Sequence, residues 1–89
     1  MEHYVLYQYD GCPYCHRVRR FIAEHGIEVE LRDTLYDPAA RRELIEGGGR
    51  STVPCLRIER DGAVTWLYES LDIIDYLRRA RARQGGAAG

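Results

Sequence analysis

Two cysteines three positions apart, Cys12 and Cys15, have the residue type and spacing for thiol chemistry. A β-branched and aromatic run precedes them and helical spacing follows, so they are expected where a strand gives way to a helix. Cys12 would cap that helix, whose free N–H groups and dipole stabilise a thiolate. Cys15, one turn later, would face inward. The pair predicts disulfide exchange, with an exposed Cys12 attacking and a shielded Cys15 resolving the mixed disulfide.

The same cysteines also fit two other kinds of site. With His16 they match the C-x-x-C-H spelling of c-type haem attachment, although that chemistry needs an oxidising compartment and the sole methionine is Met1. Cys55 or His16 could join them in a zinc or iron–sulfur site, but a four-ligand protein site is spelled incompletely. Cys55 equally suits a small packing residue on a strand. We expect no bound metal.

The composition is that of one soluble domain. The chain has 89 residues, 45% of them hydrophobic, with 13 basic and 14 acidic side chains and a net charge of −1. This charge gives no general attraction to nucleic acid or anionic lipid, and no leader or long apolar run is visible. We expect a cytoplasmic protein without nucleic-acid or membrane partners. Its domain is expected over residues 1–84, with a flexible Gly/Ala tail over 85–89.

Hydrophobic periodicity and turn residues predict seven elements around the cysteines. They are strands over 4–9, 27–32, 55–59 and 64–68, and helices over 13–25, over 39–46 before a glycine run, and from about 70 onward. The inward positions are expected to include Ile27, Val29 and Leu31 on the second strand and Leu71, Ile74 and Leu77 on the last helix. The order β-α-β-α-β-β-α predicts an α/β fold with a mixed four-stranded sheet and helices on both faces.

Three motifs together resemble the glutaredoxin family. They are Cys12-Pro13-Tyr14-Cys15 after a tyrosine-rich strand, Thr52-Val53-Pro54 before the third strand, and Glu69-Ser70 with Asp72 at the start of the last helix. The run Leu6-Tyr7-Gln8-Tyr9-Asp10 and the Glu69-Ser70 pair are also similar to the subgroup that shares its fold with glutathione transferase N-terminal domains. The resemblance covers about residues 4–82. It implies a thioredoxin fold, a cis peptide at Pro54, glutathione as reducing co-substrate, and glutathionylation of Cys12.

The resemblance also implies a glutathione site. Its expected residues are Tyr14, Thr52, Val53, Pro54, Glu69, Ser70 and Asp72, with charge support from Arg17 and Arg50. The backbone of Val53 would pair with glutathione, and Ser70 and Asp72 would hold its γ-glutamyl end. A serine at a helix N-terminus suits a carboxylate by its own chemistry, but Ser70 and Asp72 also suit capping and charge-matching of their own helix.

Three features depart from the family pattern. Tyr9 stands where many glutaredoxins carry a basic residue, and Asp10 adds a negative charge that would oppose ionisation of Cys12. Arg50 lies one residue further from Thr52 than the usual basic partner, so a solvated loop arginine is an equal interpretation.

We interpret the chain as a dithiol glutaredoxin, an enzyme that reduces glutathione mixed disulfides and protein disulfides. Its expected partners are glutathione and glutathionylated or disulfide-containing proteins, and it is expected to be a monomer. The alternatives are a zinc- or iron–sulfur-binding relative, and a non-catalytic glutathione-transferase-like binding module.

Overall fold

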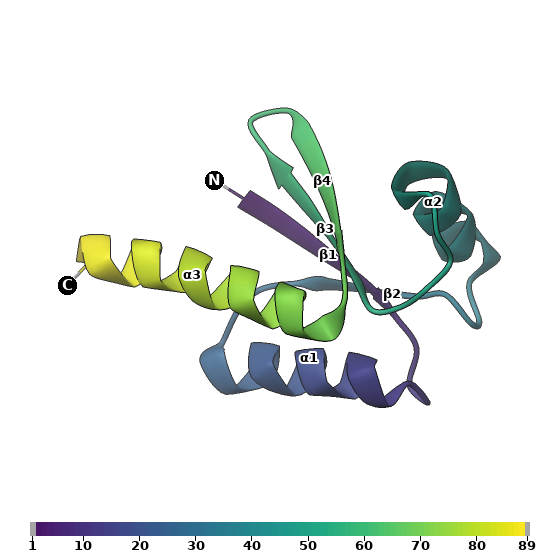
Figure 1. Cartoon of the computed structure of the whole chain (residues 1–89), viewed down its shortest axis with the longest axis horizontal. Coiled ribbons are helices and arrows are strands. Elements are labelled where there is room, and N and C mark those ends of the chain that lie inside the picture. The colour runs from purple at the N-terminus through teal and green to yellow at the C-terminus, as the bar shows by residue number, and fades with distance from the viewer. Residues whose placement is uncertain (1, 89) are drawn as a thin grey trace.

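The computed structural model describes the backbone of residues 2–88 and the side chains of residues 2–82 (Figure 1). The elements follow in the expected order: β1 (Glu2–Gln8), α1 (Pro13–His25), β2 (Glu30–Asp33), α2 (Pro38–Gly48), β3 (Cys55–Arg60), β4 (Ala63–Tyr68) and α3 (Ser70–Ala88). Within this described part, no helix is both long enough and apolar enough to cross a membrane.

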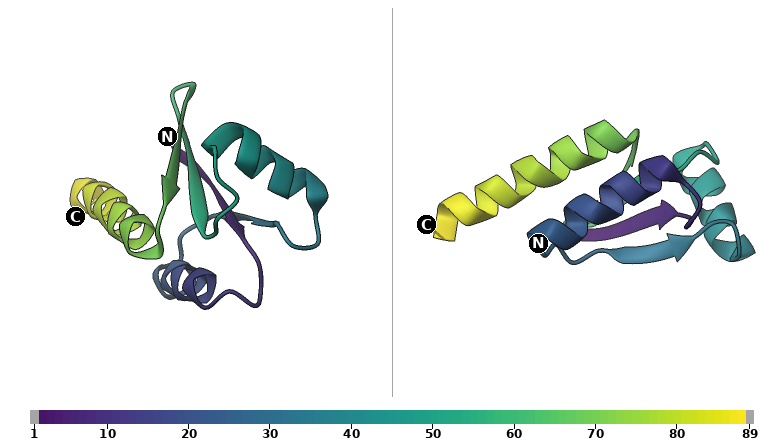
Figure 2. Two further views of the ribbon diagram at one scale, coloured as in Figure 1. Left: turned by 45° about the vertical axis from the view of Figure 1, so that its right-hand side comes forward. Right: turned by 90° about the horizontal axis from the view of Figure 1, so that it is seen from below.

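The four strands form one mixed sheet in the order β2-β1-β3-β4. β1 and β2 run parallel, joined through α1, while β1 with β3 and β3 with β4 are antiparallel. Helices α1 and α3 lie side by side on one face of the sheet, and α2 covers the other (Figure 2). The predicted α/β class, the mixed four-stranded sheet and the helices on both faces are therefore confirmed.

Two apolar clusters fill the spaces on either side of the sheet. Successive residues of β1 point to opposite faces, so Leu6 packs under α1 and α3 while Tyr7 packs under α2. The α1/α3 side is completed by Tyr4, Val18, Phe21, Leu56, Ile58, Ile73 and Leu77. The α2 side is completed by Val5, Ala40, Leu44, Cys55 and Tyr68.

The second strand is shorter than expected. Pairing with β1 begins only at Glu30, so Ile27 and Val29 precede the strand, although both still pack against the α1/α3 cluster. The expected burial of Leu31 is wrong, since its residue is 50% exposed. β2 is an edge strand with a neighbour on one side only, which leaves its side chains less covered.

Helix α2 does not end at the start of the glycine run as expected. It continues through Gly47 and Gly48 and is capped by Gly49, which has a φ of 89°. A Cβ on Gly47 would overlap the indole of Trp66, and one on Gly48 would overlap the hydroxyl of Tyr68. The first two glycines therefore let the helix lie close against β4, and only the third ends it.

The inward face expected for α3 is wrong at one of its three residues, since Leu77 is buried and Ile74 packs against the α1/α3 cluster. Leu71 is 66% exposed, whereas Ile73, Leu77 and Ala80 are buried. The helix begins at Ser70 as expected, and its buried stripe follows the i, i+4, i+7 spacing from Ile73. Its backbone is helical to Ala88, into the stretch expected as a Gly/Ala tail. Gly89 and the side chains from residue 83 onward lie outside the described residues, so the separate tail stays a prediction.

Candidate active site

The Cys12 sulfur caps the N-terminus of α1. Pro13 occupies the first helical turn, and Cys12 Sγ accepts the backbone N–H of Cys15 at 3.1 Å. A hydrogen bond from Cys12 N–H to the Tyr9 carbonyl, at 3.3 Å, closes the turn that leads into the helix. The predicted strand-to-helix position and capping role of Cys12 are confirmed, and the sulfur lies where helix N–H groups stabilise a negative charge.

The expected exposure of Cys12 is wrong. Its residue is only 5% exposed, because the turn from Tyr9 folds it back against the first turn of α1. The cap that stabilises a sulfur anion also covers part of it. A reacting disulfide would have a narrow line of approach.

Cys15 is fully buried, as expected, and both cysteines are free thiols. Burial, and then the hydrogen bond with the Cys12 side chain, raises the pKa of Cys15 to about 12. A pKa this high keeps the Cys15 thiol protonated at neutral pH.

A cleft of about 640 Å³ lies along the N-terminal ends of α1 and α3. It is lined by Tyr14, Arg17, Arg50, Thr52, Val53, Pro54, Glu69, Ser70, Leu71 and Asp72. Every residue that the sequence predicted for glutathione binding or charge support thus lies around one cavity. The cleft is also lined by Leu71, which was expected in the core instead. Cys12 does not line the cleft, although Tyr14, two residues later on α1, does.

Two segments of unusual backbone form part of the cleft wall. The peptide between Val53 and Pro54 is cis, as the family resemblance implied. Glu69 has a φ of 74°, a conformation uncommon for residues other than glycine, and its carbonyl accepts the N–H of Ile73 at 3.0 Å as α3 begins. Ser70 is buried and Asp72 lies exposed in the first turn. The free N–H groups of that turn suit an anion.

The charges near Cys12 differ from the sequence interpretation. Asp10, which was expected to oppose ionisation of Cys12, forms an ion pair with Arg19 at 3.6 Å. Arg19 also donates to the side-chain oxygen of Gln8 and to the Tyr9 carbonyl. This arginine lies on α1 and compensates Asp10, a pairing that the helical spacing from the cysteines did not reveal.

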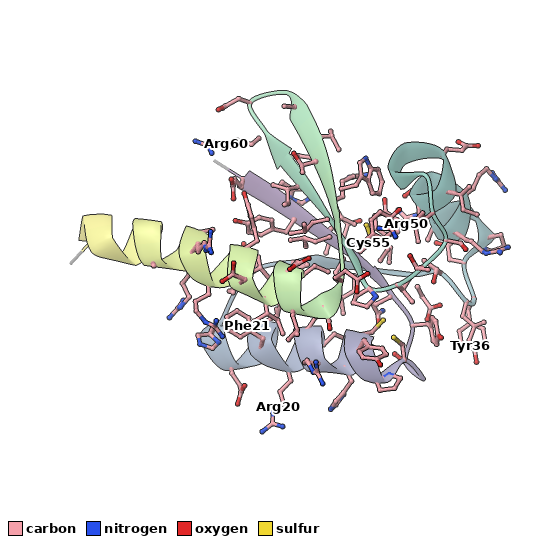
Figure 3. All side chains as sticks on the ribbon, viewed as in Figure 1. Arg20, Phe21, Tyr36, Arg50, Cys55 and Arg60 are labelled. Atoms are coloured by element: carbon pink, nitrogen blue, oxygen red, sulfur yellow. The ribbon has the colours of Figure 1, made fainter. Side chains whose placement is uncertain are left out.

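Sequence reasoning missed Tyr68, the last residue of β4, which contacts Arg50 beside the cleft. The Arg50 guanidinium lies 4.2 Å from the centre of the Tyr68 ring, and Figure 3 shows Arg50 beside Cys55 where β3 begins. Burial raises the pKa of Tyr68, and burial also raises the pKa of Cys55 to about 11. Tyr68 directly precedes Glu69-Ser70 in the sequence, and this adjacency could have indicated that Tyr68 lies near the glutathione site.

The residues suggested for a metal site lie apart from one another in the part of the chain with described side chains. No group of three or more His, Cys, Asp or Glu residues is arranged there to hold a metal ion. His16 is exposed on α1, while Cys55 is buried in the cluster beneath α2.

Comparisons with known proteins place the chain among glutathione-related proteins. The family described as "Glutathione S-transferase, N-terminal domain" matches residues 6–85. Glutaredoxin 3 of Escherichia coli strain K12 is 32% identical over 59 residues, which cover 66% of this chain and 71% of that protein.

Two solved structures extend the comparison. Maleylacetoacetate isomerase from Anaeromyxobacter dehalogenans, with glutathione bound in its active site, is 28% identical, with a TM-score of 0.69. The match covers 89% of this chain and 38% of the isomerase, so the chain spans less than half of that relative. Glutaredoxin from Brucella melitensis, at 24% identity, shows the shared thioredoxin-like fold with a TM-score of 0.59, over 93% of this chain and 85% of that one.

Proposed function

Because the chain belongs to the glutathione S-transferase N-terminal domain family, we propose that it is a glutathione-dependent thiol–disulfide oxidoreductase of the dithiol glutaredoxin type. The observation that carries the proposal is the Cys12 sulfur on the N-terminus of α1, whose first turn contributes Tyr14 to the cleft. A capping sulfur is an effective nucleophile and leaving group, and a neighbouring cleft of this size suits a tripeptide.

Glutathione is proposed to lie along the cleft. Val53 would pair its backbone with the peptide, while Ser70 and the first turn of α3 would hold the γ-glutamyl carboxylate. Glu69 and Asp72 would face the neighbouring ammonium group. This orientation directs the cysteine of glutathione toward the end of α1.

The reduction of a glutathione mixed disulfide needs only Cys12. Its thiolate attacks the glutathione sulfur, forms a Cys12–glutathione disulfide and expels the substrate thiolate, which takes up a proton. A second glutathione thiolate then attacks the bound glutathione sulfur. Oxidised glutathione leaves, and the Cys12 thiolate is regenerated.

Protein disulfides would also use Cys15. Cys12 first forms a mixed disulfide with the substrate, and Cys15 then loses its proton and attacks Cys12 Sγ, which releases the second substrate thiol. Two of the causes that raise the pKa of Cys15 are its hydrogen bond with the Cys12 side chain and the charge of that group. Burial, the largest cause of the raised pKa, stays in the mixed disulfide, but the negative charge of the Cys12 thiolate is gone and no longer opposes ionisation of Cys15. Two glutathione molecules then reduce the Cys12–Cys15 disulfide.

The test couples oxidation of glutathione to glutathione reductase and follows NADPH absorbance, with the mixed disulfide of glutathione and 2-mercaptoethanol as substrate. Cys12→Ser is expected to abolish turnover, and Cys15→Ser to retain it while losing reduction of a protein disulfide. Cys55→Ala removes the third buried thiol and is expected to keep kcat; only kcat is compared, because the Cys55 thiol contacts Tyr68 beside the cleft. Turnover by Cys12→Ser would refute the assignment.

A second candidate is glutathione binding without thiol turnover. The 5% exposure of Cys12 favours it, since a covered sulfur reacts slowly with disulfides. Binding of glutathione measured by calorimetry, together with wild-type turnover no faster than free glutathione, would select this candidate.

We propose that the oxidoreductase acts as a cytoplasmic monomer on glutathionylated and disulfide-containing proteins.

A further inference from the structure

Tyr68 holds the main chain of Arg50 through one hydroxyl group. The Tyr68 hydroxyl donates to the Arg50 carbonyl at 3.0 Å and accepts the Arg50 N–H at 3.3 Å. The same ring lies beneath the Arg50 guanidinium. Tyr68 thus fixes both the backbone position of Arg50 and the direction of its side chain.

Tyr68 is itself firmly placed. It is buried at the end of β4, pairs with Cys55 on β3, and packs in the cluster beneath α2. The missing side chain of Gly48 leaves room for its hydroxyl at the end of α2. Two strands and a helix therefore hold Tyr68, while Arg50 lies in an exposed segment between α2 and β3.

Arg50 lines the cleft without a carboxylate partner. Among residues 2–82, where side chains are described, no Asp or Glu forms an ion pair with it. Glu69 and Asp72 line the same cleft from the start of α3. Arg50 comes from a different segment, the one that leads to Thr52 and Pro54. A guanidinium in this setting suits a ligand carboxylate.

We propose that Tyr68 is a positioning residue that holds the Arg50 guanidinium in the cleft for the glycyl carboxylate of glutathione. The inference rests on the proposed function and adds a residue to it. Tyr68 does not touch the ligand in this arrangement. It acts through its hydroxyl, which fixes the main chain at Arg50, and through its ring, which lies beneath the guanidinium.

The test compares glutathione with glutathione esterified at the glycyl carboxylate, in wild type and Tyr68→Phe. Phenylalanine keeps the ring beneath Arg50 and removes the hydroxyl. We expect the KM for glutathione to rise about 3- to 10-fold, the effect of one or two ordinary hydrogen bonds, with kcat unchanged. The KM for the ester should stay as it is in wild type, because the ester lacks the carboxylate that Arg50 binds.

Tyr7→Phe is the matched control. Tyr7 is a buried tyrosine of the same cluster, and its hydroxyl donates to Glu43 at 2.9 Å instead of contacting Arg50. Its loss is expected to lower the free energy of unfolding but to leave the KM ratio of glutathione to ester unchanged. A purely structural role for Tyr68 would give the same pattern as Tyr7→Phe and would overturn the proposal.

A double variant tests whether Tyr68 acts through Arg50. Arg50→Gln should raise the KM for glutathione, and adding Tyr68→Phe should raise it little further. If the fold increases in KM of the two single variants multiplied in the double variant, Tyr68 would act independently of Arg50 and the proposal would be overturned. Calorimetric binding of S-methylglutathione and its glycyl ester gives the same comparison without turnover. If Tyr68→Phe weakens binding of S-methylglutathione but not of its glycyl ester, the inference is supported, even where the protein shows no turnover. If the protein turns over but Tyr68→Phe weakens the two ligands equally, the inference is refuted and the proposed function is not.

Discussion

Gly48→Ala should destabilise the protein, although alanine is the better helix former. At the end of α2 a Cβ on residue 48 would overlap the Tyr68 hydroxyl and lie 3.0 Å from Tyr68 Cζ and 3.3 Å from Trp66 Cε3. Helix propensity favours alanine by about 1 kcal/mol. Overpacking costs about 2 kcal/mol. Displacing the Tyr68 hydroxyl weakens two hydrogen bonds to Arg50, at about 1 kcal/mol each. The expected net loss is about 3 kcal/mol.

Urea unfolding followed by far-ultraviolet circular dichroism measures this loss. With a slope of about 1.5 kcal/mol per molar urea, the midpoint falls by about 2 M. Glu46→Ala, an exposed change on the same helix, is the control and should shift the free energy of unfolding by less than about 0.5 kcal/mol. If Gly48→Ala were as stable as wild type or more stable, propensity would outweigh the contact with Tyr68 and the close approach of α2 to β4 would be refuted.

Three further outcomes concern stability. Because burial raises the pKa of Cys15 from 9.0 to about 12, its contribution to stability is complete below pH 9 and is lost as the pH rises toward 12; Cys15→Ser should flatten that fall in the melting temperature. Asp37 caps α2 by accepting the N–H of Ala39 at 3.0 Å, so Asp37→Ala should lower the free energy of unfolding by about 1 kcal/mol while Asp37→Ser keeps most of it, in urea titrations. Gly26 ends α1 with a φ of 61°, so Gly26→Ala should cost about 1 kcal/mol and Gly26→Asn less; equal losses for both would contradict the left-handed cap.

Local signals sufficed for the start and end of α1. Pro13 after Cys12 and the left-handed position at Gly26 are set by neighbouring residues, and the helix lies where they place it. The gathering of the cleft residues came instead from family resemblance, since Tyr14, Thr52 and Ser70 are far apart in the chain. No period or turn residue links them.

The errors arise where tertiary contacts decide. A pair of glycines usually ends a helix, but Gly47 and Gly48 let α2 lie against Trp66 and Tyr68 of β4. Those two residues are far away in the sequence, so the residues next to the glycines do not predict the contact. The residues expected on the inward face of α3 follow steps of three, which drift around a helix of about 3.6 residues per turn, so Leu71 falls outside the buried stripe that Ile73 and Leu77 share. The exposure of Cys12 depends on how the preceding turn folds, which its capping role alone does not specify.

The shelter around Cys12 has a consequence for chemical probes and inhibitors. Because only 5% of the Cys12 residue is exposed, the size and shape of an electrophile decide whether it can reach the sulfur, and its intrinsic reactivity matters only after that. Slender alkylating agents should label this sulfur faster than bulky maleimides, in reverse of their rates with a free thiol in solution. An electrophile attached to a peptide that fills the cleft would therefore owe its selectivity for Cys12 to the peptide.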